Sequence, residues 1–231
     1  MLSNDNEYKK NVINKIIQVY NCDMLDKKHI KFLNDLKNAN FIPKVVYDIG
    51  SSTCHYSRHV RNIWPECDVI LFDAFEPLKH LYETLDYKYN IVVLSDEDDK
   101  EVKFYQNDLL SAGNSYYIEI GTKNIFTDNN YILKKTKKLD TIVDDKKYLY
   151  PDLIKIDVQG AELDVIKGSL NVLKYTKLLI IEMQHKEYNL NAPNVNITMQ
   201  YLEMLGWKCI ANKFICNEFD GDYCFINTNL I

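Results

Sequence analysis

The sequence contains no long apolar run. A transmembrane helix would need about 18 or more consecutive apolar residues, and residues 1–21 also lack the apolar core and small-residue cleavage site of a secretory signal. Internal repeats and low-complexity linkers are absent as well. We therefore expect a cytoplasmic protein with no membrane span.

Basic residues do not outnumber acidic ones. The 28 lysines and arginines face 33 aspartates and glutamates, a net charge of −5, which argues against a nucleic-acid partner held by a broad basic face. The six cysteines show no CxxC spacing, so neither a zinc site nor a disulfide framework is predicted. The chain has 231 residues, of which 46% are hydrophobic. This length and composition are enough for one domain with a hydrophobic core.

Short apolar runs alternate with helical segments along most of the chain. Residues 5–39 have the spacing of two amphipathic helices, which we expect to form an N-terminal cap over residues 1–40. The sequence then changes to runs typical of buried strands: KVVYDIG (44–50), DVILFDAFEP (68–77), NIVVLSD (90–96), DLIKID (152–157) and KLLIIEM (177–183). Helical segments at 77–85 and 160–174 lie between them. This order predicts an α/β fold over residues 41–231, with a parallel sheet covered by helices on both faces.

Two segments depart from this order. Residues 97–150 are polar and indicate an insertion with a strand at 101–106, in which we expect Lys134, Lys135, Lys137 and Lys138 to lie on a solvated helix face. After a helix at 197–207, strands near 208–212 and 222–227 follow each other with no helix between them. That order predicts an antiparallel pair at the end of the sheet.

The strand ends carry polar residues suited to a nucleoside. In an open α/β sheet, ligands bind beyond the carboxyl ends of the strands. The first strand ends in Asp48 and Gly50, followed by Ser51, Ser52 and Thr53, and the second ends in Asp73 and Glu76, whose carboxylates suit a ribose diol. The turn DIGSSTCHYS has one glycine, so the G-x-G-x-x-G pattern of dinucleotide folds is missing. A cofactor with a ribose but no phosphate fits this loop, and S-adenosylmethionine (SAM) is the commonest example.

Five ordered motifs resemble those of one enzyme family. VVYDIGSS, FDAFEP, VVLSD, KKLDTIVDD and above all DLIKIDVQGAELDVIKGS are similar to the motifs of the FkbM family of SAM-dependent methyltransferases, over about residues 44–185. The resemblance implies the Rossmann-like class I methyltransferase fold, with a seven-stranded, mostly parallel sheet whose last strand is antiparallel. It also implies O-methylation, because family members with known roles methylate hydroxyl oxygens of sugars and natural products.

The resemblance assigns cofactor contacts by position. It gives Asp48, Gly50 and Ser52 to the methionine end of SAM, with Ser51 and Thr53 in the same turn. It gives Glu76 to the ribose, and Ser95 and Asp96 to the adenine side. The family often has a second glycine where this chain has Cys54. We expect the turn to open differently there, or the cofactor to lie slightly farther from the backbone.

The candidate catalytic residues lie at the ends of the next two strands, Lys155 and Asp157 on one and Glu182 and His185 on the other. Asp157 and Glu182 converge if their strands are neighbours, where they could hold Mg²⁺ or Mn²⁺, or one of them could act as a base. Histidine is the usual proton acceptor near neutral pH, so His185 is a second candidate base. The structural alternatives are that Asp157 caps the helix beginning near Gly160 and that His185 lies in solvent.

The ordered motifs and the family that they resemble imply a SAM-dependent O-methyltransferase acting on a hydroxyl of a sugar or glycan-type acceptor. One alternative is ribose 2′-O-methylation of RNA, because Lys155, Asp157 and Glu182 resemble part of the Lys-Asp-Lys-Glu tetrad of such enzymes, although the acidic net charge makes RNA a poor partner. Another alternative is a SAM-binding module without catalysis. We expect acceptor specificity to come from residues 1–40, 107–150 and 186–196.

Overall fold

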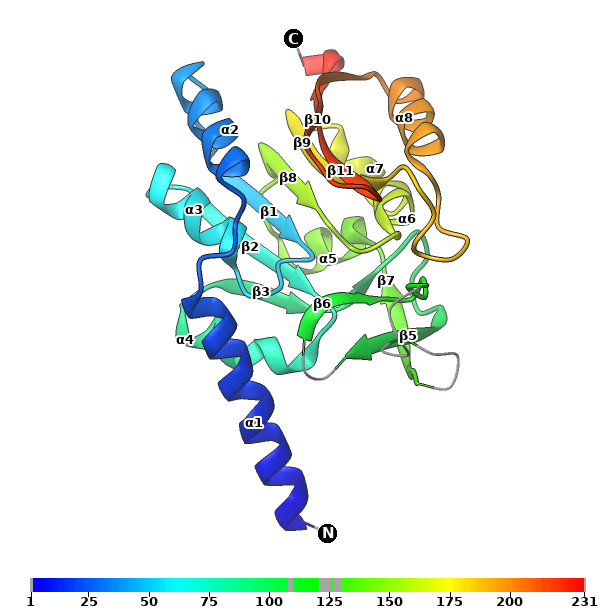
Figure 1. Cartoon of the computed structure of the whole chain (residues 1–231). Coiled ribbons are helices and arrows are strands. Elements are labelled where there is room, and N and C mark those ends of the chain that lie inside the picture. Colours follow the sequence, from blue (N-terminus) through cyan, green and yellow to red (C-terminus); the bar gives the residue numbers. More distant parts are fainter. Residues whose placement is uncertain (1, 108–109, 121–125, 127–129, 231) are drawn as a thin grey trace.

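A seven-stranded sheet forms the centre of the computed structural model, which describes residues 2–107, 110–120, 126 and 130–230 (Figure 1). Across the sheet the strands are β10 (Trp207–Cys216), β11 (Asp220–Asn227), β9 (Leu178–Gln184), β8 (Leu153–Ile156), β1 (Val45–Ile49), β2 (Asp68–Asp73) and β3 (Lys88–Ile91). Neighbours from β9 to β3 are parallel, whereas β11 is antiparallel to both β9 and β10. The predicted mostly parallel sheet with an antiparallel last strand is confirmed.

Helices cover both faces of this sheet. One face packs against α1 (Leu2–Asn21), α2 (Lys27–Asn38), α3 (His55–Ile63) and α4 (Lys79–Thr84), and the other against α5 (Leu139–Lys146), α6 (Glu162–Lys167), α7 (Leu170–Leu173) and α8 (Val195–Met204). Along β1, Val45, Tyr47 and Ile49 belong to one core cluster and Val46 to the other, because successive strand side chains point to opposite faces. All five residues of β1 are buried, as expected for a central parallel strand.

The two N-terminal helices pack on the rest of the molecule. Helix α1 contacts α4, β6 (Leu110–Ser115) and the short 3₁₀ helix η1 (Glu76–Leu78), and its N-terminal end extends away from the body (Figure 1). Helix α2 begins after Asp26, whose side chain accepts a hydrogen bond from the Lys28 amide at 2.7 Å, and it contacts α3 and β10. The predicted pair of amphipathic helices is confirmed, and α2 brings His29 against the main sheet.

The inserted segment forms a second sheet. Its strands follow the order β4 (Val93–Leu94), β7 (Ile132–Lys137), β5 (Glu101–Asn107) and β6. The predicted strand at 101–106 is confirmed as β5, whereas the predicted strand at 90–96 divides between β3 of the main sheet and β4 of this one. Residues 108–109, 121–125 and 127–129 of the predicted insertion lie outside the described residues.

The solvated helix face predicted for the lysine cluster is wrong. Lys134, Lys135 and Lys137 belong to strand β7, and Lys138 follows it. Thr136 is fully buried, and half-buried Lys134 donates a hydrogen bond to the Ala74 carbonyl and lies 4.5 Å over the Phe104 ring. The segment therefore presents alternate side chains to the protein, with a period of two instead of a helical period.

A close backbone contact divides the helix predicted at 160–174. It forms α6 and α7, with Gly168 between them, and a side-chain carbon at Gly168 would overlap the Ser95 carbonyl. Toward the C-terminus, α8 begins after Asn194, whose side chain accepts from the amides of residues 196 and 197. Over the described part of the chain, no helix combines the length and apolar character needed to cross a bilayer.

Candidate active site

The loop after β1 has an unusual backbone. Gly50, Ser52 and Cys54 have φ angles of +78°, +42° and +62°, and the amides of Gly50 and Ser51 donate to the Phe72 carbonyl of β2 at 2.8 and 3.2 Å. Cys54 precedes α3 in the left-handed conformation that glycine adopts most readily. Its side chain is fully buried and is not among the described residues that line the two neighbouring cavities.

The first cavity has a volume of about 440 Å³ and mostly apolar walls. It extends from the loop after β1 past the ends of β2 and β3 to the second sheet. Its lining includes Gly50, Ser52, Thr53, His55, Asp73, Ala74, Leu94, Tyr116 and Asp157. Its volume lies in the range of about 300–1,000 Å³ that is common for small-molecule sites.

The structure divides the sequence-predicted cofactor residues between two cavities. Gly50, Ser52 and Thr53 line the first one, and these three together with Asp48 and Ser51 line a second cavity. Glu76 is exposed at the start of η1, Ser95 is buried and Asp96 is exposed, and none of these three is among the described lining residues. Ser95 Oγ nevertheless lies 3.3 Å from the hydroxyl of Tyr116, which does line the first cavity.

Asp73 organises the loop from the end of β2. Its carboxylate accepts hydrogen bonds from the Ser52 amide at 2.8 Å and the Phe75 amide at 2.9 Å. Burial raises the pKa of Asp73 to about 6, and the two amides oppose this shift. Both oxygens of this carboxylate are thus engaged with the backbone that they position.

The second cavity, of about 290 Å³, is lined by the same loop. It shares five lining residues with the first: Gly50, Ser52, Thr53, His55 and Asp157. Its other walls come from β1 and the loop after it, from α2 and α3, and from β8, β9, β10 and β11. They include Asp48, Ser51, Lys155 and Glu182. The two cavities therefore meet at a common boundary beyond the carboxyl ends of β1 and β8.

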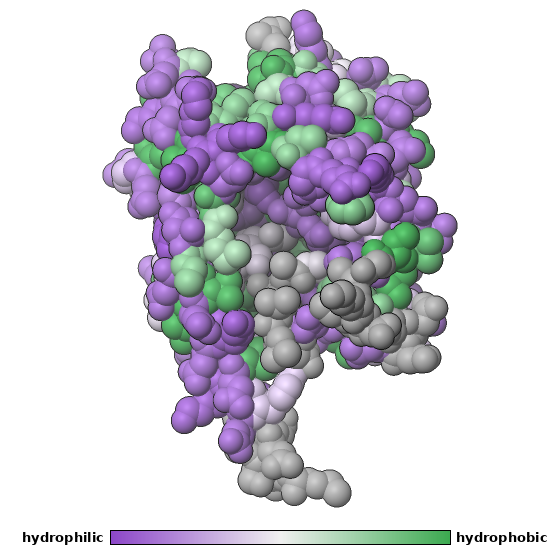
Figure 2. Space-filling view, viewed as in Figure 1, coloured by the Kyte–Doolittle hydropathy of each residue, from purple (hydrophilic) through white to green (hydrophobic). Residues whose placement is uncertain are grey.

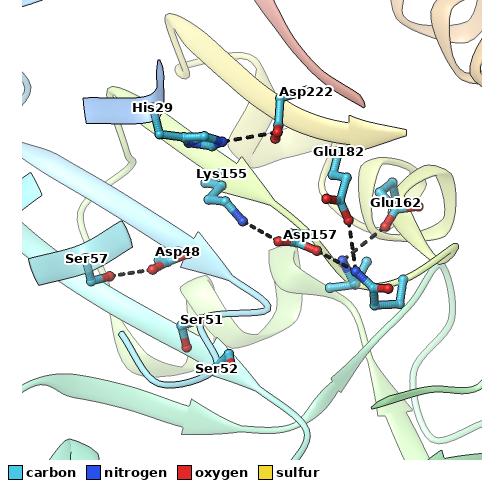
Figure 3. A network of polar contacts seen from close by, with 12 residues as sticks. His29, Asp48, Ser51, Ser52, Ser57, Lys155, Asp157, Glu162, Glu182 and Asp222 are labelled. Carbon is cyan, nitrogen blue, oxygen red and sulfur yellow. Dashed lines mark hydrogen bonds and ion pairs between the residues drawn. The ribbon is translucent and has the colours of Figure 1, made fainter. Parts of the chain in front are cut away.

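Three of the predicted catalytic residues form one hydrogen-bonded network (Figure 3). Lys155 Nζ lies 2.7 Å from Asp157 Oδ2. The amide nitrogen of Gln159 donates to Asp157 Oδ1 and to Glu182 Oε2, both at 2.9 Å. Because β8 and β9 are neighbouring parallel strands, Asp157 and Glu182 converge, with Gln159 between them.

The charges of this network follow from burial and from its ion pair. Burial pushes the pKa of Asp157 upward, but the Lys155 ammonium and the hydrogen bonds hold it below the ordinary value. Burial opposes the charge of Lys155, yet the carboxyls of Asp157 and Asp48 raise its pKa. Burial and the negative charge of Asp157 raise the pKa of Glu182 well above its ordinary range. The network thus favours the ionised form of Asp157 and the protonated form of Glu182.

Asp157 does not cap the following helix. Helix α6 begins after Ala161 without a side-chain cap, and the buried carboxyl of Glu162 accepts from the amides of Val158 and Gly160 at 3.0 and 3.1 Å. Burial raises the pKa of Glu162 to about 7 against these hydrogen bonds. Glu162 closes the turn after β8, which leaves the Asp157 side chain facing the two cavities.

The residues present do not fit the metal ion expected at Asp157 and Glu182. Both Asp157 oxygens accept hydrogen bonds, from Lys155 and from Gln159. The described residues also contain no group of three or more histidine, cysteine or acidic side chains placed to hold a metal. An ammonium in contact with one carboxylate occupies the position that a cation would need.

Two histidines, His29 of α2 and His55, are among the described residues that line the second cavity, and His29 lies only in this one. Its Nε2 lies 3.1 Å from Asp222 Oδ2 of β11 (Figure 3). The predicted base, His185, is half-buried after β9, where its amide donates to the Phe219 carbonyl, and it is not among the described residues lining either cavity.

Sequence reasoning missed His29, Asp222 and Gln159. Neither His29 nor Asp222 lies in a motif, and they meet only because α2 packs beside the last strand. Gln159 does lie inside the motif DVQGAE. Its position between Asp157 and Gly160 was the available signal.

Comparisons with known proteins point to one family. Residues 44–209 match the family model described as the methyltransferase FkbM domain. Over 63 residues the chain is 33% identical to the hexuronic acid methyltransferase AglP of Haloferax volcanii. The matched segment covers 27% of this chain and 26% of that protein. The chain thus spans about a quarter of the length of this curated relative.

A solved structure with low sequence identity shares the fold. The structure of a candidate O-methyltransferase from Klebsiella pneumoniae matches with a TM-score of 0.50 at 10% identity, covering 96% of this chain and 90% of that one. The FkbM methyltransferase of Methylobacillus flagellatus matches with a TM-score of 0.48 at 14% identity, covering 79% of this chain and 43% of that one. At such identities the likeness concerns the fold alone.

Proposed function

Since the chain belongs to the FkbM methyltransferase family, we propose that it is a SAM-dependent O-methyltransferase acting on a hydroxyl of a sugar or glycan-type acceptor. The observation that carries the proposal is the meeting of two cavities at Gly50, Ser52, Thr53, His55 and Asp157. Methyl transfer requires a donor and an acceptor on opposite sides of one point, aligned with the bond that breaks. Two cavities with a shared boundary supply that arrangement.

In this proposal the first cavity holds the cofactor. The loop after β1 binds the methionine end through Gly50 and Ser52, which line this cavity. Asp48, also predicted at the methionine end, lines the second cavity. The nucleoside then extends along Asp73 and Ala74 toward Leu94 and Tyr116, in the apolar part of the cavity. Glu76 remains the predicted ribose contact and Ser95–Asp96 the predicted adenine neighbours.

The second cavity holds the acceptor, and Asp157 takes its proton. When bound, SAM supplies a methyl group already activated on a sulfonium sulfur. The chain then has to place the acceptor oxygen and remove its proton. Asp157 lies at the boundary of both cavities, and the Lys155 ammonium keeps it ionised. We assign the base to Asp157 and not to His185, which lies outside the lining residues of both cavities.

A sugar-type acceptor is supported by the chemistry of the second cavity. Its walls carry hydroxyl, carboxyl and imidazole groups, which match the hydroxyls of a sugar. The short match to a hexuronic acid methyltransferase points the same way. The RNA alternative fits less well, because the many carboxyl groups of this cavity would repel a phosphate backbone.

Calorimetric titration with S-adenosylhomocysteine (SAH), with NAD⁺ as the control ligand, tests the cofactor. We expect micromolar binding of SAH and none of NAD⁺. Release of SAH from SAM, measured with a panel of sugar-bearing acceptors, then tests the reaction, and Asp157→Asn should lose turnover while keeping its affinity for SAH. A folded protein that does not bind SAH would overturn the proposal. Binding without turnover on any acceptor would favour the non-catalytic module.

A further inference from the structure

Carboxyl groups dominate the wall of the second cavity. Five of the described residues that line it are acidic: Asp26, Asp48, Asp157, Glu182 and Asp222. Among the same lining residues the nitrogen bases are Lys155, His29 and His55. Figure 2 shows a hollow near the centre of this face, in the region between α2 and β11, where hydrophilic residues form the floor.

These nitrogen bases offer no positive charge to a ligand anion. The Lys155 ammonium is already paired with Asp157, and its side chain is 7% exposed. Burial lowers the pKa of His29 to about 4, and it also lowers the pKa of His55, so both imidazoles are neutral at neutral pH. A ligand carboxylate would therefore lose its hydration in this cavity without gaining a cationic partner.

Four polar atoms of the cavity wall have no hydrogen-bond partner within the described part of the chain. They are Asp48 Oδ1, the Tyr56 hydroxyl, His29 Nδ1 and His55 Nε2. The first three belong to buried residues and His55 is half-buried. All four residues line the cavity. Buried polar atoms are nearly always paired in native proteins, so these atoms indicate contacts that a polar ligand completes.

We propose, on the premise of the methyltransferase function above, that this cavity binds an amino sugar, a hydroxyl-bearing acceptor with an ammonium group, in preference to a uronate. The hydroxyls would meet the unpartnered atoms of Tyr56 and His29. The ammonium would lie against Asp26 and Asp222, whereas a ligand carboxylate would be repelled by these two groups in their ionised form.

Two of the carboxyl groups can be separated from the cofactor. SAM is itself positively charged, and Asp48 and Asp157 lie beside the loop proposed for its methionine end. Asp26, which precedes α2, and Asp222 of β11 line the second cavity and not the first. Burial raises the pKa of Asp222 to about 7, so a neighbouring ammonium would draw it into its ionised form. Asp26 and Asp222 are therefore the groups through which the charge of the acceptor is distinguished.

A matched series of three sugars tests the inference. Methyl glucoside, its 6-amino-6-deoxy analogue and methyl glucuronide differ only at carbon 6, which is neutral, cationic or anionic. Their dissociation constants are measured by ligand-observed NMR on the SAH-saturated protein at neutral pH. We expect the amino sugar to bind at least tenfold more tightly than the uronide. In Asp26→Asn/Asp222→Asn the difference should shrink to within threefold, while SAH affinity stays within twofold of wild type.

The single variant Asp26→Asn controls for loss of folding, because asparagine caps a helix as well as aspartate does. It should partly reduce the difference in dissociation constant between the amino sugar and the uronide. Equal or tighter binding of the uronide, an unchanged difference in the variants, or no binding of any of the three sugars would overturn the inference. If SAH itself does not bind, the proposed function fails first, and that result is separate from the behaviour of the sugars.

Discussion

Gly50 lies directly against the main-chain carbonyl of Asp157. A side-chain carbon built on Gly50 would overlap that carbonyl oxygen, and the Asp157 amide donates to the Ile49 carbonyl at 2.9 Å. The loops after β1 and β8 are thus held together backbone to backbone. This contact positions the boundary at which the two cavities meet.

Gly50→Ala should therefore disturb the site more than a typical glycine substitution. Gly206 provides the matched control, because its φ of +84° is close to the +78° of Gly50, while its added methyl would meet the flexible Asn229 side chain. A left-handed residue other than glycine costs about 1–2 kcal/mol, which is the loss expected for Gly206→Ala. We expect Gly50→Ala to lose more stability in chemical denaturation and to lose SAH binding in calorimetry. Equal losses in the two variants would contradict this view.

Cys54→Gly should change cofactor affinity little, although this position departs from the family motif. Glycine would relieve the left-handed backbone at φ +62°, but it would add flexibility to the unfolded chain and remove a fully buried side chain. We expect these opposing contributions to the free energy of unfolding to offset each other within about 1–2 kcal/mol. Calorimetry should give an SAH dissociation constant within twofold of wild type. A tenfold gain would show that the cysteine holds the cofactor away from the backbone.

The main sheet could be predicted from the sequence because its signal is local. Each central strand is an apolar run buried on both faces, such as KVVYDIG, and the intervening helical segments dictate parallel crossovers. Strand β7 escaped prediction because its side chains are mostly polar and its order comes from pairing with β4 and β5. The break at Gly168 likewise depends on a distant partner, the Ser95 carbonyl.

The same difference between local patterns and distant contacts applies to the site. Asp48, Gly50, Asp157 and Glu182 could be named in advance because they lie at or just after the carboxyl ends of their strands, and those ends share one edge of a parallel sheet. The contact of His29 with Asp222 joins opposite ends of the chain through the docking of α2, which no local pattern encodes.

Glu76→Ala should weaken SAH binding roughly tenfold or more, the loss of a charge-assisted contact worth about 1.5–3 kcal/mol. Asp73, the other acidic group at this strand end, already accepts two backbone hydrogen bonds. Glu83→Ala is the control, since Glu83 is exposed on α4 and accepts from the Tyr89 hydroxyl. Both variants are titrated calorimetrically with SAH. An unchanged dissociation constant for Glu76→Ala would remove Glu76 from the ribose site.

The contributions of Asp222 and His29 to the free energy of unfolding should change with pH in opposite directions. Burial raises the pKa of Asp222 from its ordinary 3.8 to about 7, with Lys155 opposing the shift. Between about pH 4 and 7 the folded state therefore binds more protons than the unfolded state. The stability that the protonated Asp222 contributes is lost as the pH rises. Burial lowers the pKa of His29 from 6.5 to about 4. Its contribution is present above about pH 6.5 and is lost as the pH falls toward 4.

Two variants separate these contributions in thermal denaturation. Relative to wild type, the Tm of Asp222→Asn should climb between pH 4 and 7, because the penalty of ionising Asp222 is removed. The Tm of His29→Gln relative to wild type should instead decline between pH 4 and 6.5, because the variant lacks the histidine contribution. Slopes of the same sign for the two variants would rule out these assignments.

The Lys155–Asp157 pair should show strong coupling in a double-mutant cycle. Removing one partner of a buried ion pair costs about 3–5 kcal/mol, because the other charge is left uncompensated. Lys155→Met should cost more than Asp157→Asn, since the Asp157 side chain is 28% exposed and the ammonium also faces Asp48 and Asp222.

The double variant Lys155→Met/Asp157→Asn should cost less than the sum of the two single variants in chemical denaturation, because it leaves neither charge of the pair behind. Additive costs would mean that the two groups are independent despite their 2.7 Å separation. All three variants should lose turnover, since either the ionised carboxylate or the ammonium that keeps it ionised is missing. A double variant with restored stability but no activity would then separate what the pair does for the fold from what it does for the reaction.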